Sequence, residues 1–179
     1  MSLYLALKFL HLVGAAVLLG TGAGIAFFLY RAERHETPAI VAGTLRIVVA
    51  ADYLFTATAA IAQPLTGLWL VSVAGYALDQ TWIVASLVLY ALVAVCWLPV
   101  VVIQIRMRDI AAAAVAQGAS ALPESYWRLS RVWFWLGWPA FISVLAIFWL
   151  MIAKPPDGAR KSPACRPADR ASSYERRSS

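Results

Sequence analysis

The sequence predicts an all-α protein, a four-helix transmembrane bundle with proline-kinked helices and a disordered C-terminal tail. The first observation is composition. Of the 179 residues, 62% are hydrophobic and 13% are charged, about half the charged share of an ordinary soluble domain. A soluble core cannot hide that much apolar surface in a chain of this length. The second observation is that charged residues bracket long uncharged intervals. Twenty-two uncharged residues separate Lys8 from Arg31, and 22 separate Arg131 from Lys154. Twenty-six separate Asp52 from Asp79, and another 26 separate Asp79 from Arg106.

Each uncharged interval is long enough to cross a hydrocarbon core of ~30 Å as a helix, which takes about 20 residues. Lipid offers the backbone no hydrogen-bond partners, so the spanning segments are expected to be helical. The intervals are apolar all round, whereas strands of a membrane barrel would alternate. The four expected helices are residues 3–30, 45–73, 82–105 with a polar extension to 117, and 123–153 with its membrane part from 132.

Each of the first two expected helices has an alternative interpretation. Residues 3–30 run about twice the length of the apolar region of a signal peptide and include Lys8 and His11, so we expect a membrane span rather than a cleaved leader. Residues 45–73 contain Pro64. We expect one kinked helix there, and the alternative is a split at Pro64 into two short segments.

The last two helices carry their own boundary signals. Gly118 is expected to stop the third helix, and Pro123 suits the first turn of the fourth. Residues 1–154 are therefore expected to form one transmembrane domain. Residues 155–179 are rich in Pro, Ser, Arg and Asp and lack an apolar period. They are expected to form a disordered basic tail.

The distribution of Lys and Arg predicts the orientation. The connections 31–46 and 106–131 are rich in Arg, whereas the loop between the second and third helices has no Lys or Arg. The positive-inside rule makes the first two connections cytoplasmic, so both termini would face outward. The net charge of +6 then reflects topology and attraction to the lipid bilayer. No nucleic-acid partner is expected, because no folded basic face is visible.

Two ionisable residues, His11 and Asp52, lie inside the apolar layer, where such groups are functional candidates by default. Four residues fall within about two turns of the depth of His11: Gln63, Thr66, Tyr90 and Trp149. A histidine with aromatic neighbours suits haem b or another porphyrin, with Lys8 placed to pair with a propionate. Imidazole also suits a metal ion such as copper, or a proton relay. The alternative is that His11 hydrogen-bonds Gln63 or Tyr90 and that Lys8 extends to the interface.

A haem held by two histidines of one chain is excluded, because His35 lies about 36 Å further along a straight helix. Asp52 is expected about 10 Å from the cytoplasmic end of its helix. Arg106 and Arg131 approach the same end, so we expect a structural ion pair between Asp52 and one of them. The alternative for Asp52 is proton transfer. Gln104 is expected at the membrane interface, and the tryptophans between 133 and 138 in a packing or interface belt.

Helix packing suggests further features. Ala16, Gly20 and Gly24 form a ridge of small residues at spacing four. Such a ridge either joins two copies of the chain as a homo-oligomer or only allows close packing within the bundle. Prolines lie inside three of the helices, at positions 64, 99 and 139. Each frees a carbonyl group that must face protein, water or a ligand, so the kinks either widen a cavity or serve packing.

Several motifs resemble a bacterial family of predicted integral membrane proteins of unknown function, a DUF family. The motifs are Leu7-Lys8-Phe9-Leu10-His11-Leu12, Gln63-Pro64-Leu65-Thr66-Gly67-Leu68-Trp69, Cys96-Trp97-Leu98-Pro99, the run 106–109, Tyr126-Trp127-Arg128-Leu129 and Gly137-Trp138-Pro139. The resemblance covers residues 3–155 and implies a multi-pass protein of the bacterial inner membrane.

That family is distantly similar to two groups of four-helix membrane proteins, the CopD-like copper-resistance proteins and the HemJ-type protoporphyrinogen oxidases. The shared element is Lys-x-x-His, here Lys8 and His11. In HemJ-type proteins this histidine is linked to haem binding, so the resemblance implies that role for His11. The chain lacks a second intramembrane histidine and the later basic motifs of those oxidases, which weighs against oxidase activity more than against cofactor binding.

Three functions are therefore open. One is haem or porphyrin binding through His11 for membrane redox chemistry. The others are transport of a metal ion or small solute, and a non-catalytic assembly subunit. No nucleophile and base pair, phosphate loop or zinc motif is present, so the sequence predicts no particular enzymatic reaction.

Overall fold

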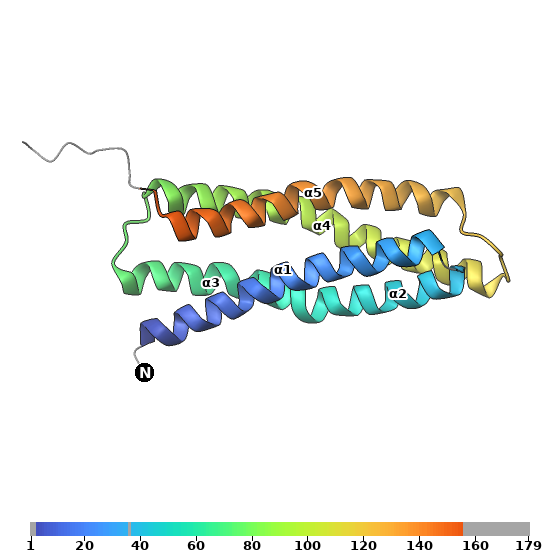
Figure 1. Ribbon diagram of the computed structural model, residues 1–179, viewed down its shortest axis with the longest axis horizontal. Helices are drawn as coiled ribbons and strands as arrows, with labels where there is room; N and C mark the ends of the chain where they lie inside the picture. Colours follow the sequence, from blue (N-terminus) through green and yellow to red (C-terminus); the bar gives the residue numbers. More distant parts are fainter. Residues whose placement is uncertain (1–2, 36, 156–179) are drawn as a thin grey trace, which may run out of the picture.

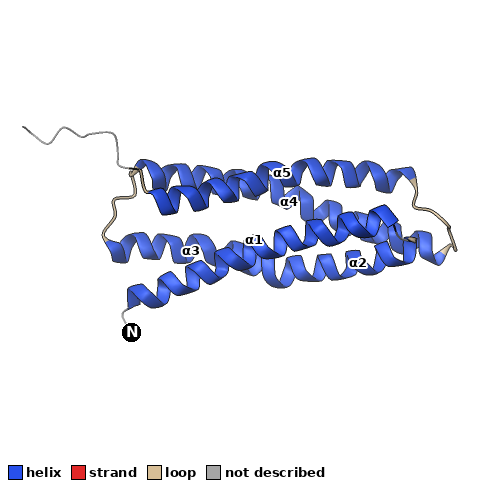
Figure 2. Ribbon diagram, viewed as in Figure 1, coloured by secondary structure: helices blue, strands red, loops and turns tan. Residues whose placement is uncertain are grey.

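The computed structural model describes residues 3–35 and 37–155, and these form a bundle of long helices (Figures 1 and 2). The elements in chain order are α1 (Leu3–His35), α2 (Pro38–Ala51), a π-helical segment η1 (Asp52–Thr56), α3 (Ala57–Ala74), α4 (Thr81–Ala116) and α5 (Glu124–Ala153). Over the described residues, four helical stretches are long and apolar enough to cross a membrane. The predicted four-helix transmembrane bundle is thereby confirmed.

The second span is one continuous rod, Pro38–Ala74, in which α2, η1 and α3 follow without a break. The expected single helix is confirmed, because Pro64 lies inside α3 and does not split it. The irregularity lies earlier, at η1, where the Ala57 amide bonds the Asp52 carbonyl five residues back. Such π-turns insert one extra residue into a helix and are frequent at functional sites.

The predicted connection 31–46 is wrong in extent. α1 continues to His35 and α2 already begins at Pro38. The arginines follow the apolar stretch, but a helix can continue past that stretch because its backbone bonds are internal. Pro38 then begins the next helix, where the missing N–H of proline is harmless. At the other connection, Gly118 takes a left-handed conformation (φ 66°) just after α4, as expected of a helix stop.

The helices do not pack equally along their length. α1 packs along α3 and α2, α4 packs along α5, and α2 contacts α4. At the end holding α2, all the spans come together. Toward the opposite end, the α1 and α3 ribbons diverge from those of α4 and α5 (Figure 1). There the Lys154 ammonium group, just after α5, donates to the Tyr76 hydroxyl at 3.1 Å.

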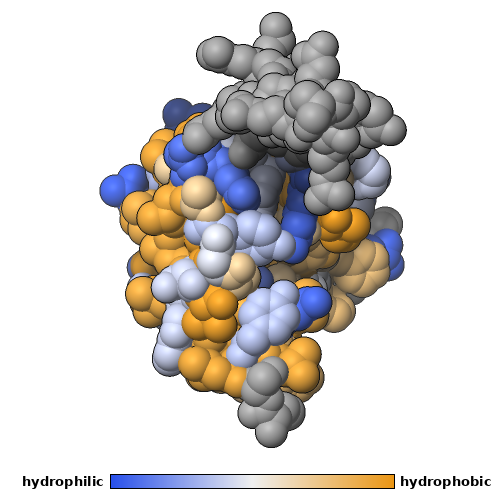
Figure 3. Space-filling model, turned by 90° about the vertical axis from the view of Figure 1, so that its left-hand side faces the viewer, coloured by the Kyte–Doolittle hydropathy of each residue, from blue (hydrophilic) through white to orange (hydrophobic). Residues whose placement is uncertain are grey.

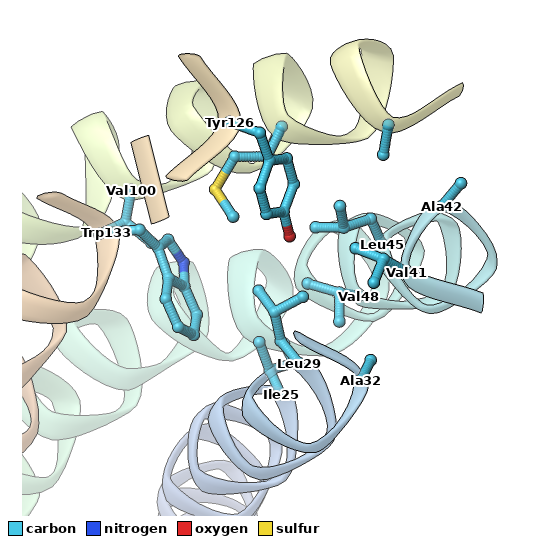
Figure 4. Packing of buried hydrophobic residues seen from close by; sticks show 12 residues of the cluster. Ile25, Leu29, Ala32, Val41, Ala42, Leu45, Val48, Val100, Tyr126 and Trp133 are labelled. Carbon is cyan, nitrogen blue, oxygen red and sulfur yellow. The ribbon is translucent and has the colours of Figure 1, made fainter. Parts of the chain in front are cut away.

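The tightly packed end contains the hydrophobic core. Leu29, Leu45, Met107 and Tyr126 have no exposed surface. In Figure 4, Tyr126 and Trp133 reach from α5 toward Leu29 of α1 and Leu45 of α2. The Tyr126 hydroxyl donates a 2.8 Å hydrogen bond to the Glu33 carboxylate on α1. This bond fixes the C-terminal part of α1 against α5.

The outer surface is suited to lipid. Ile47, Trp135 and Ile152 are 72%, 71% and 79% exposed although they are large and apolar. Figure 3 looks along the bundle at the end where α3 finishes and α4 begins, and hydrophobic side chains cover much of the periphery there. Exposed apolar surface on this scale is expected of a protein embedded in a bilayer. Apart from Pro155, the predicted disordered tail lies outside the described residues.

We predict that Tyr126→Phe destabilises the bundle by about 1–2 kcal/mol, because a hydrogen bond to a charged group is lost inside the core. The measurement is unfolding of the purified protein by SDS in mixed micelles. Tyr30→Phe is the matched control, because Tyr30 is 42% exposed. Equal stability of the two variants would contradict a stabilising Tyr126–Glu33 bond.

Candidate functional site

His11 lies at a close contact between α1 and α3. Its Nδ1 atom is 2.8 Å from the Thr66 hydroxyl oxygen, and its side chain is 9% exposed. The Thr66 hydroxyl donates its one proton to the Ala62 carbonyl at 2.8 Å, so its oxygen accepts from the Nδ1–H of a neutral imidazole. The ring rests on Gly67, where a Cβ atom would lie 3.2 Å from His11 Cε1.

A second polar contact joins the same two helices. The Gln63 amide nitrogen donates to the His11 carbonyl oxygen at 3.0 Å. It reaches this oxygen by passing over Gly14, where an added Cβ atom would collide with the Gln63 amide. Gly14 and Gly67 therefore let α1 and α3 approach closely enough for both bonds.

The structure brings only part of the predicted His11 site together. Gln63 and Thr66 do contact His11. The Tyr90 hydroxyl donates instead to the Ala60 carbonyl, and Trp149 is 70% exposed on α5. Lys8 is also exposed, with its ammonium group 5.9 Å from the Tyr4 ring centre. Equal depth fixes only the height of a residue, and the faces on which Tyr90 and Trp149 lie are set by packing.

The Tyr90 bond has its own physical reason. Pro64 lacks an N–H, so the Ala60 carbonyl one turn earlier loses its helical partner. At membrane depth such a carbonyl needs another donor, and the Tyr90 hydroxyl from α4 supplies it. The expected freed carbonyl is thus satisfied by protein at this proline.

The predicted ion pair between Asp52 and Arg106 or Arg131 is wrong. The Arg131 guanidinium is 3.1 Å from Glu124, and Arg106 is exposed. Because the second span begins at Pro38, Asp52 lies about 20 Å along it, well beyond the reach of interfacial arginines. Its side chain is only 4% exposed.

Asp52 instead belongs to a cluster of polar side chains from η1, α4 and α5. Thr56, Trp97 and Gln104 face its carboxyl group. Among the described residues, five buried polar side-chain atoms lack a hydrogen-bond partner: Asp52 Oδ2, Thr56 Oγ1, Trp97 Nε1, Gln104 Oε1 and Trp133 Nε1. An unpaired buried polar atom costs about 1–3 kcal/mol. Thr56, Trp97 and Gln104 offset part of this cost through weak contacts with the Asp52 carboxyl group, but none of the five atoms has a hydrogen bond of good geometry.

All five of these atoms belong to residues that line one cavity of about 550 Å³ in the middle of the bundle. The rest of its wall is largely apolar and comes from α1, α3, α4 and α5. Lining residues at its edge are exposed, among them Gly22 and Ala23 on α1 and Trp138 on α5. The cavity is therefore open toward the surrounding lipid. This volume is typical of pockets for small organic ligands.

Sequence reasoning missed this site. Gln104 and Trp133 were expected in interface or packing positions, yet both are buried and line the cavity. A signal was present in the spacing: Asp52 and Thr56 are four residues apart, and Trp97 and Gln104 are seven apart, so each pair lies on one helical face.

The described residues offer little to a metal ion. No three side chains of His, Cys, Asp or Glu come together within them. The predicted metal role of His11 would therefore rest on a single protein ligand, whereas stable metal sites usually have three or four.

Comparison with known proteins gives one match. The model of the family described as "Predicted integral membrane protein (DUF2269)" matches residues 5–155, which include nearly all of the helical bundle. No curated protein and no solved structure matches the chain. The expected similarity to CopD-like and HemJ-type proteins stays a prediction.

We predict that Gly14→Ala lowers the stability of the protein by about 1–3 kcal/mol, because the new methyl group displaces the Gln63 amide. Gly43→Ala is the control: a Cβ atom there meets nothing within 4 Å. SDS unfolding measures both. The loss should shrink in the Gln63→Ala background, where no amide is left to displace. An undiminished loss would show that this contact is not its cause.

Proposed function

We propose that this chain, which belongs to the DUF2269 family of predicted integral membrane proteins, binds a small lipid-soluble molecule in the central cavity. The observation that carries the proposal is the gathering of five unpaired buried polar atoms on a wall that is otherwise largely apolar. A ligand with one polar end and an apolar body would match both parts of this wall.

Energetics support such a ligand. Polar atoms inside a membrane cannot turn to bulk water, so weak contacts with one another compensate their desolvation only in part until a better partner arrives. A polar group placed beside Asp52 and Gln104 would supply that partner. The apolar body would lie against residues such as Ala60, Val93 and Phe141. Because the cavity is open toward lipid, the ligand would enter sideways from the bilayer.

The same site would serve transport of a small solute, one of the functions expected from the sequence. Pro64, Pro99 and Pro139 each lie inside a helix that contributes to the cavity wall. Proline permits a helix to bend without breaking further backbone bonds. Bending at these positions would change the separation of the α1 and α3 pair from the α4 and α5 pair.

Haem or porphyrin binding through His11 is the second candidate function. The observation that favours it is the bond to Thr66, which holds Nδ1 and leaves Nε2 as the ligand nitrogen, as in many haem and metal sites. His11 lies outside the set of residues that line the cavity. The macrocycle would therefore bind at the α1–α3 surface, with Lys8 nearby on the same helix.

We further propose that the protein lies in a bacterial inner membrane with the α1–α2 and α4–α5 connections in the cytoplasm, as the positive-inside rule indicates. The small-residue ridge on α1 also stays a proposal as a contact with a second copy. Ala16 and Gly20 are exposed, and a Cβ atom at Gly20 meets nothing within 4 Å. Close packing within the described bundle therefore does not explain Gly20.

We predict that a small molecule co-purifies with the protein in stoichiometric amount and is lost when the cavity is filled. Gly22→Leu and Gly137→Leu add bulk at two cavity positions where a Cβ atom meets nothing within 4 Å. Gly43→Leu adds the same bulk outside the cavity, at a position where a Cβ atom also meets nothing within 4 Å. Native mass spectrometry measures the bound molecule. Equal occupancy in the filled variants and in Gly43→Leu would overturn the proposed site.

For the second candidate, we expect a Soret absorption band in protein purified from cells supplied with haem. His11→Ala should abolish the band and His35→Ala should leave it unchanged, because the two residues lie about 36 Å apart along α1. Absence of a Soret band in the unaltered protein would reject haem binding.

A further inference from the structure

The described lining of the cavity holds one carboxyl group and no basic side chain. Asp52 and Tyr90 are the titratable residues among its described lining, and no Lys, Arg or His takes part. The Tyr90 hydroxyl is occupied by the Ala60 carbonyl. The groups facing Asp52 from its own segment and from α4 are Thr56, Trp97 and Gln104, which are all uncharged. No positive side chain is thus available there to balance an ionised Asp52.

The cavity wall is also rich in aromatic side chains. Six of the lining residues are aromatic: Tyr90, Trp97, Trp133, Phe134, Trp138 and Phe141. Phe134 packs edge-on against Trp138 with ring centres 6.0 Å apart, so part of this wall is held in a defined arrangement. The faces of aromatic rings, Trp most of all, attract cations when water is excluded.

From the lone carboxyl group and the aromatic wall together, we infer that the ligand is a hydrophobic organic cation that exchanges with a proton at Asp52. This inference rests on the proposed function and specifies the class of ligand. A carboxylate in the membrane is costly without a counter-charge. Either a proton or a bound cation can remove that cost.

Other ligand classes fit less well. An anionic head group would meet a carboxyl group and no positive side chain. A neutral head group could pair with the indole N–H groups and with Gln104 while Asp52 stays protonated, but it would gain nothing from the faces of the aromatic rings. A cation satisfies Asp52 by charge and the aromatic rings by cation–π attraction, while Thr56, Trp97 and Gln104 are placed to donate to the carboxylate.

The exchange balances in charge and atoms. The neutral carboxylic acid of Asp52 loses its proton to solvent as the cation binds, which leaves a carboxylate–cation pair of zero net charge. One proton is released for each cation bound. Binding should therefore tighten as pH rises, because fewer protons compete, with a limit of about tenfold for each pH unit while Asp52 is mostly protonated in the empty protein.

The test uses two probes of nearly equal size and shape but opposite charge, tetraphenylphosphonium and tetraphenylborate. Binding to the full chain in lipid nanodiscs is measured by equilibrium dialysis across a range of pH, with empty nanodiscs subtracted. We expect tetraphenylphosphonium to bind at least tenfold more tightly than tetraphenylborate. We also expect its affinity to rise with pH and one proton to be released per cation bound.

Variants at Asp52 distinguish the loss of its carboxylate charge from a loss of folding. Asp52→Asn should lose at least tenfold in tetraphenylphosphonium affinity together with its pH dependence, and Asp52→Glu should keep both in part. Asp109→Asn is the matched control, because Asp109 is exposed and paired with Arg108 outside the cavity. Thermal unfolding of each variant identifies any that fails to fold. If Asp52→Asn does not fold, the comparison of the two probes on the unaltered chain still decides.

Equal binding of both probes, or unchanged tetraphenylphosphonium binding in Asp52→Asn, would overturn the cation inference. It would leave the proposed cavity intact if a co-purified molecule is still lost in Gly22→Leu. If Gly22→Leu leaves both the co-purified molecule and the tetraphenylphosphonium affinity unchanged, the cavity itself is not the binding site and the proposed function fails with it.

Discussion

A polar atom inside a lipid bilayer must find its partner within the protein, and this constraint organises the whole structure. The helices meet it along most of their length through their own backbone bonds. Where Pro64 interrupts that pattern, a hydroxyl from α4 takes the freed carbonyl. Where Gln63 and His11 lie between α1 and α3, each finds a partner on the facing helix. The exceptions are the unpaired atoms around Asp52, and the proposed ligand site rests on them.

The two polar sites differ in what surrounds them. At His11, Gly14 and Gly67 remove the bulk that would hold the helices apart, so the polar groups bond directly. At Asp52, the π-helical segment η1 begins where the spans start to diverge, and a cavity lies between them. A close contact of the first kind stabilises the fold. An open site like that at Asp52 leaves polar atoms without good partners, so a ligand that pairs with them gains free energy on binding.

The uneven packing of the bundle connects these features. Around Tyr126 and Leu29 the helices form a dense core at one end, and α1 is tied there to α5 by the Glu33 bond. Toward the other end, α1 stays with α3 and α4 stays with α5. The cavity lies where the dense part gives way to the divergent part. A ligand there would contact both helix pairs, and its binding would stabilise one separation of the pairs over others.

The sequence by itself determined that this is a helical membrane protein with four candidate spans. Apolar composition and the spacing of charges can be read along the chain and need no knowledge of packing. It also gave Gln63 and Thr66 about the same depth as His11, since depth along a helix follows from residue number, but it gave Tyr90 and Trp149 that depth as well. Only the tertiary structure decided that Asp52 lies with Trp97 and Gln104 rather than with arginines. It also decided that the Tyr90 hydroxyl bonds Ala60 and that Trp149 is exposed. The reason is geometric: residue number gives the height of a side chain in the membrane, whereas the rotation of each helix and its neighbours are fixed by contacts between residues distant in sequence.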